Sequence, residues 1–150
     1  MDKENEKFSY TLGGYTSFIR HETKNIVFPF SQYKEHWVMG YVYTRLADKK
    51  SAAQKIYTFD KVSEIELPYK DVKFFFQEKW KIAGDKAGSG NTTNIGSISG
   101  RLEDFVAGNT PFVSEEEFLD YWRNYEKTSQ TRAKKYSNIH EYRIWKSGQL

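Results

Sequence analysis

The sequence has no cysteine among its 150 residues, and this absence excludes several kinds of chemistry. Such a chain forms no disulfide, has no thiol nucleophile and builds no thiolate metal site. The three histidines, His21, His36 and His140, lack the spacing of zinc ligands, so we expect no metal site. A chain without cysteine also fits a reducing compartment, which favours a cytoplasmic location.

Long hydrophobic runs are also missing. No apolar run approaches the roughly 18 residues that a membrane-spanning helix needs. Residues 1–7 are mostly charged or polar and lack the apolar core of a signal peptide. We therefore expect a cytoplasmic protein without a membrane partner, with a disordered leader at 1–7 and a single domain at 8–150.

The motifs of several enzyme classes are absent as well. No Lys-Ser or Lys-Thr pair follows the glycines of residues 84–100, so a Walker A nucleotide site is excluded. The dinucleotide fingerprint fails because Thr93 occupies its third glycine position. No G-x-S-x-G elbow presents a serine nucleophile. The sequence therefore predicts no cofactor and no catalytic residue.

Aromatic residues, by contrast, are abundant: 11 Phe, 11 Tyr and 4 Trp make up 17% of the chain. Aromatic side chains favour β-strands, and Tyr and Trp also suit binding surfaces. The formal net charge of +3 is mildly basic, with bases clustered at 70–86 and 132–146. This arrangement of charge indicates a nucleic-acid partner more than the net charge does.

Hydrophobic patterns predict mainly strands, with one long helix near the C-terminus. The expected strands cover 8–20 in two pieces, 25–30, 37–46, 56–59, 62–67, 71–83 and 140–146. A short helix at 101–107 should end at Gly108. A longer helix at 114–127 begins with Ser114 and Glu117 in capping-box spacing. Its apolar stripe, which we expect in the core, is Phe118, Tyr121, Trp122 and Tyr125.

The segment 71–83 is the strongest predicted strand, and its alternate residues should face opposite sides. We expect the core face to hold Val72, Phe74, Phe76, Trp80 and Ile82. We expect the outer face to hold Lys73, Phe75, Gln77, Lys79 and Lys81. Glu78 interrupts this alternation, which indicates a bulge or a buried ion pair.

Residues 84–100 are rich in glycine and small polar side chains, and we interpret them as a DNA-reading arm. Glycines let backbone N–H groups approach a phosphate closely, and an asparagine amide pairs with an adenine edge through both its atoms. We expect base contacts from Ser89, Asn91, Thr92 and Asn94. Phosphate contacts should come from Lys79, Lys81 and Lys86. The alternative is a mobile surface loop, although loops of this length usually have a function.

Residues 13–24 form a second arm of similar composition. Here the expected phosphate contacts are Arg20, His21 and Lys24, so that two arms would grip a duplex from two sides. The alternative is an ordinary hairpin with a solvated, charged end.

Three other functions stay open. A Mg²⁺-dependent nuclease would use Glu78 and Lys79, although Gln77 stands where such enzymes carry an acid, two residues before the lysine. A protein-interaction domain would use the helix at 114–127. A reader of modified bases or RNA would use an aromatic pocket built from Trp37, Tyr41, Tyr43 or Trp80.

The arrangement resembles the B3-like DNA-binding pseudobarrel of plant transcription factors and of recognition domains in bacterial restriction endonucleases. Residues 11–24 would match its first arm and 79–96 its second. The passage KWKIAGDKAGSGNTTNIGS, followed by FLDYWRNYE, is similar to C-terminal recognition modules of some restriction endonucleases. The resemblance covers residues 8–126 and implies an α+β, mainly β fold, an open barrel of about seven strands. The long C-terminal helix departs from the plain family pattern.

We therefore predict a domain that binds double-stranded DNA sequence-specifically in a restriction-modification or related defence system. Under this hypothesis the domain is not catalytic, and another domain or subunit supplies cleavage. The expected partner besides DNA is a nuclease or translocase domain or subunit.

Overall fold

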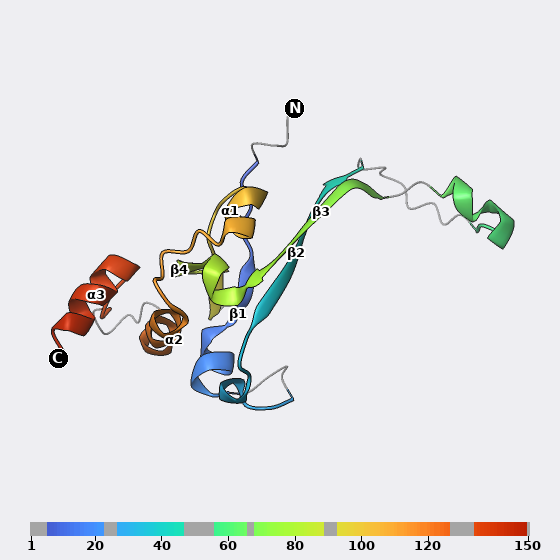
Figure 1. The fold of residues 1–150 in the computed structure, drawn as a ribbon. Coiled ribbons are helices and arrows are strands. Elements are labelled where there is room, and N and C mark those ends of the chain that lie inside the picture. The colour runs from blue at the N-terminus through green and yellow to red at the C-terminus, as the bar shows by residue number, and fades with distance from the viewer. Residues whose placement is uncertain are drawn as a thin grey trace.

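The computed structural model describes residues 6–22, 27–46, 56–65, 68–88, 93–126 and 134–149. Figure 1 shows a body of short strands and helices from which a long two-stranded ribbon extends. The strands are β1 (Thr11–Gly14), β2 (Trp37–Arg45), β3 (Tyr69–Glu78), β4 (Ala83–Ala87) and β5 (Asn94–Ser97). The α-helices are α1 (Leu102–Ala107), α2 (Glu115–Asn124) and α3 (Ile139–Ser147). Shorter helical turns are η2 (Tyr15–Arg20), η3 (Phe30–Gln32), η4 (Phe59–Glu64) and η5 (Lys79–Ile82).

The strands form two separate antiparallel sheets. One has three strands in the order β1-β5-β4, and the other is the β2–β3 ribbon. A mixed fold of sheets and helices is confirmed. Within the described ranges there are five strands rather than about seven, the two sheets do not close into a barrel, and the C-terminal part holds two helices rather than one long one.

The core is an aromatic cluster between η2 and α2. Tyr121 and Trp122 of α2 are completely buried, and the Tyr15 ring of η2 lies 5.2 Å from that of Trp122. The predicted stripe of α2 is therefore confirmed as core, as is the Ser114 cap, whose hydroxyl accepts a hydrogen bond from the Glu117 amide. This packing fixes η2 against a rigid helix.

The predicted faces of β3 are reversed in the structure. Phe75 is 2% exposed and packs against Phe105 of α1, whereas Phe74 is 65% exposed. The turn η5 interrupts the strand after Glu78, so alternation does not continue through to Ile82, which is buried. Phe75 also lies so close to Gly40 of β2 that a Cβ there would meet its ring at 2.2 Å.

Other segments differ from the predicted strands for local reasons. Residues 140–146 belong to helix α3, because Asn138 caps the helix by accepting a hydrogen bond from the Glu141 amide. Residues 59–64 form η4, and the second piece of the expected strand at 8–20 is the π-helical turn η2. The expected loop 84–100 contains strands β4 and β5.

Of the expected leader, residues 1–5 lie outside the described residues, and Phe8 pairs with Gly100 in an isolated bridge. Among the described helices none has the length and apolar character that crossing a membrane requires. The single domain and the cytoplasmic location stay predictions.

Candidate nucleic-acid interface

The two predicted arms meet at one end of the three-stranded sheet. The hydroxyl of Thr16 in η2 donates a hydrogen bond of 2.8 Å to the hydroxyl of Thr93, the residue just before β5. The Tyr15 amide donates to the Thr93 carbonyl at 2.9 Å, and Gly14 is paired with Asn94. The arms therefore form one continuous surface, rather than two separate grips on opposite sides of a duplex.

Glycines allow this close approach at two places. Gly13 has a φ of 89°, in the left-handed region that glycine adopts without strain, where β1 turns into η2. Gly88 directly follows β4, and its amide donates to the Asn94 carbonyl at 2.8 Å. A Cβ on Gly88 would lie 2.9 Å from the Thr11 methyl group, so the Thr11 side chain would have to shift to accept a larger residue.

Arg20 is half-buried against α2 rather than free at the surface of η2. Its guanidinium donates a hydrogen bond to the Tyr125 carbonyl and lies 5.1 Å from the centre of the Tyr15 ring. It thus ties η2 to the end of α2. His21 is exposed, and Lys24 lies outside the described residues.

The three predicted lysines have very different surroundings. Lys79 is largely buried, with its ammonium 5.3 Å from the Phe18 ring centre and 5.7 Å from that of Phe30, and burial lowers its pKa to about 8. Lys81 forms an ion pair of 2.5 Å with Glu78. Lys86 of β4 is exposed. Of the three lysines, Lys86 is the only exposed one.

Of the predicted base-reading residues, the structure describes only Asn94. It is half-buried at the start of β5, opposite Gly14, and so next to the contact between the two arms. Ser89, Asn91 and Thr92 lie outside the described residues. Sequence reasoning missed the role of Thr93 in joining the arms, because no local spacing links residues 77 positions apart.

Glu78 and Lys79 do not fit the magnesium site of a nuclease. The Glu78 carboxylate is already engaged by the Lys81 ammonium and by the Trp80 indole N–H, and both hydrogen bonds lower its pKa. Lys79 packs on aromatic rings. Across the described ranges, no three Asp, Glu or His side chains are grouped closely enough to hold a metal ion.

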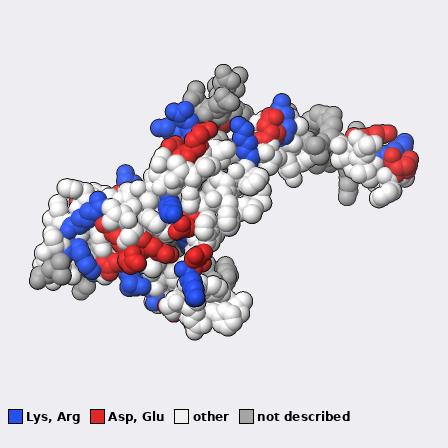
Figure 2. Space-filling model, viewed as in Figure 1, with Lys and Arg blue, Asp and Glu red and all other residues white. Residues whose placement is uncertain are grey.

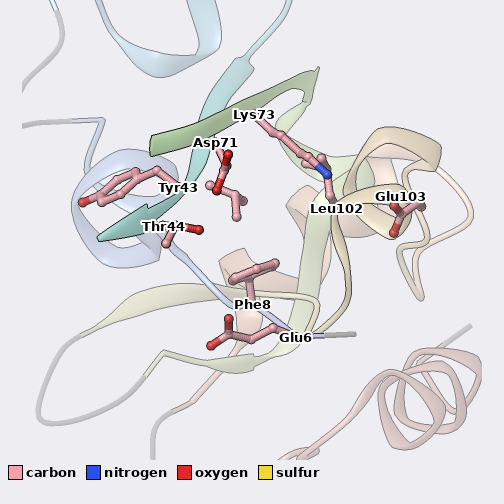
Figure 3. A pocket seen from close by; sticks show the side chains of 9 residues that line it. Glu6, Phe8, Tyr43, Thr44, Asp71, Lys73, Leu102 and Glu103 are labelled. Carbon is pink, nitrogen blue, oxygen red and sulfur yellow. The ribbon is translucent and has the colours of Figure 1, made fainter. Parts of the chain in front are cut away.

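The aromatic pocket proposed for a modified-base reader is not assembled in this form. Trp37, Tyr41 and Tyr43 are about half exposed along β2, and Trp80 lies in η5, where it bonds Glu78. A cavity of about 350 Å³ lies between the ribbon, α1 and the N-terminal segment. Of the four predicted aromatic residues only Tyr43 lines it, and Figure 3 shows Tyr43 there with Asp71 and Lys73. It is lined by none of the residues of the joined arms.

Comparison with known proteins identifies the family. Residues 1–147 match the family described as restriction endonuclease EcoRV. The chain belongs to that family. It is 65% identical over 144 residues to the type II restriction enzyme EcoRV of Escherichia coli, an alignment that covers 96% of this chain. The chain spans 58% of the length of that relative.

Membership of an endonuclease family confirms the predicted link to restriction systems and corrects the predicted role. The interpretation of a non-catalytic domain, with cleavage supplied by another domain or subunit, is wrong, because this family is one of restriction endonucleases. The nuclease alternative is the better supported, although the geometry of Glu78 and Lys79 does not suit them as its metal-site residues. The B3-like pseudobarrel is not confirmed.

Proposed function

We propose that this chain acts as part of a type II restriction endonuclease that binds a specific sequence in double-stranded DNA and cuts it. The predicted location of this enzyme is the cytoplasm, where it would meet the DNA. The identity of 65% to the E. coli enzyme carries this proposal. Identity at this level over nearly the whole chain supports a shared fold in the aligned part, which makes up 58% of the length of that enzyme.

The joined arms are the surface that we assign to the DNA. Phosphate contacts position a protein on the duplex, and base contacts supply its specificity. Lys86 and His21 are exposed beside the arms and are suited to phosphates. Base edges would be read by Asn94 together with Ser89, Asn91 and Thr92, which precede it in the chain. The Thr16–Thr93 hydrogen bond holds the two arms together.

Figure 2 shows acidic and basic side chains intermixed over the body in that view, without one broad basic face. Affinity would then depend on a few well-placed bases, and specificity on the amide and hydroxyl groups of the base-reading residues.

A selection from random duplexes tests the binding function directly, and incubation of plasmid with Mg²⁺ tests cutting. We expect one enriched sequence motif. Asn94→Ala should weaken binding to that motif about 5- to 150-fold, the equivalent of about 1–3 kcal/mol for a lost base contact, with little effect on random DNA. Asn109→Ala, an exposed asparagine after α1, is the matched control. Equal losses in the two variants, or no enriched motif, would contradict the proposal.

A further inference from the structure

The outer face of the β2–β3 ribbon is strongly apolar and exposed. Pairing of Met39 with Phe76 and of Tyr41 with Phe74 puts these residues on one face. Its large side chains range from 45% exposed at Trp37 to 65% at Phe74. The whole set is Trp37, Met39, Tyr41, Val72, Phe74 and Phe76, which we call the outer face.

Side chains of the outer face contact one another. The Trp37 and Phe76 rings are stacked, with their centres 4.7 Å apart and their planes 12° from parallel. The Tyr41 hydroxyl contacts the Met39 sulfur at 2.7 Å. Contiguous apolar patches on this scale are rare on soluble monomers and mark interaction surfaces.

The opposite face of the ribbon is covered around Phe75. Phe75 is buried there against Phe105 of α1 and the ring of Tyr10. In Figure 1 the three α-helices lie on one side of the ribbon, and no described element covers the other. Strands that are apolar on both faces are typical of a sheet that forms the middle layer between two covering layers.

We propose that the outer face is the docking site for an amphipathic α-helix from the portion of the enzyme that corresponds to the unmatched part of the E. coli relative. Since 144 residues make up 58% of that relative, its remaining 42% is about 100 residues long. Strand β2 has nine residues, so the ribbon is about 30 Å long at 3.3 Å per residue. A helix of about 20 residues spans the same length, and about 100 residues are ample to supply it.

The chemistry of the outer face favours this occupant over nucleic acid. Its six side chains carry no charge, whereas DNA binding depends on Lys and Arg placed against phosphates. A helix with an apolar stripe buries such a face while leaving its polar side in water. The inference rests on the exposed ribbon and on the length of the relative, and not on the proposed DNA surface.

Mixing the full 150-residue chain with the unmatched portion of the E. coli relative, produced as a separate polypeptide, tests the proposal without DNA. We expect saturable binding, followed by calorimetry and by a change in Trp37 fluorescence. Phe74→Lys should weaken this binding at least tenfold. Ile144→Lys on α3, also an exposed apolar residue, should leave it unchanged. Circular dichroism should show that both variants keep the parent fold.

Three results would overturn the proposal. The first is no binding of the polypeptide, and the second is equal weakening by Phe74→Lys and Ile144→Lys. The third is self-association of the chain, measured by sedimentation, that Phe74→Lys alone abolishes, because a second copy would then cover the outer face. A failure here leaves the duplex selection unaffected, so the two proposals fail separately.

Discussion

Thr16 and Thr93 share a hydrogen bond of 2.8 Å between their hydroxyls although 77 residues separate them in the chain. The bond lies at the end of the β1-β5-β4 sheet, where the Tyr15 amide also binds the Thr93 carbonyl. Two segments that each looked like an independent arm in the sequence are therefore one structural unit. A substitution in one segment should alter the DNA contacts of the other.

This coupling is measurable with a double-mutant cycle on DNA binding. Thr16→Val and Thr93→Val each remove the hydrogen bond, so the double variant should lose less affinity than the sum of the two single losses. We expect a coupling energy of about 0.5–1.5 kcal/mol, the net value of such a bond. Titration of the selected duplex measures it. Thr44→Val in β2 is the control variant. If the losses of Thr16→Val and Thr93→Val simply add in the double variant, the bond does not link the arms during binding.

Lys86 should make a phosphate contact that affects all DNA sequences alike. Lys86→Ala should weaken binding to specific and random duplexes equally and lower the slope of log K against log salt by about one unit. Binding isotherms at several salt concentrations measure the slope. Lys61→Ala removes an equally exposed charge from η4, and a matching slope change there would contradict the assignment.

Local signals in the sequence predicted α2 correctly. Its cap, acidic first turn and apolar stripe all lie within a dozen residues, and all agree with the packing. The same kind of signal marks α3, where Asn138 and Glu141 stand in capping positions. The sequence analysis predicted a strand at 140–146 instead, because Tyr142 and Ile144 alternate with their neighbours. A segment of seven residues fits both a strand and a helix.

The faces of β3 could not be predicted in the same way. Which side of a strand is buried depends on what packs on it, and the short turn η5 shifts the alternation beyond Glu78. In the candidate site, composition identified both arms, but their contact depends on the sheet order β1-β5-β4, a long-range pairing with no local signal.

The reversal of faces gives a direct test by stability. Phe75→Ala should destabilise the chain by about 3–5 kcal/mol, since it empties a buried site against Phe105 and Gly40. Phe74→Ala, the adjacent residue on the exposed face, should cost less than about 1 kcal/mol. Urea unfolding followed by circular dichroism measures both. Equal losses would contradict the reversal of faces. A greater loss for Phe74→Ala would support the faces expected from the sequence.

The buried ammonium of Lys79 should make stability depend on pH. Burial lowers its pKa to about 8, from 10.5 for a free lysine. Between these two values the unfolded chain binds more protons than the folded chain, so the contribution of Lys79 to the free energy of unfolding rises with pH. Below pH 8 both states are protonated, and the folded state bears the full cost of a buried charge.

Lys79→Met removes the charge while keeping a long side chain over Phe18 and Phe30. The variant should therefore be more stable than the parent at pH 7, and its advantage should shrink from pH 8 towards pH 10.5. Urea unfolding of both proteins at intervals across this range gives the difference, which cancels the titration of groups common to both. Lys86→Met, at an exposed position, should show no such trend. A constant difference between Lys79→Met and the parent at every pH would mean that Lys79 is solvated in the folded chain, and that its ammonium is free to meet a phosphate after all.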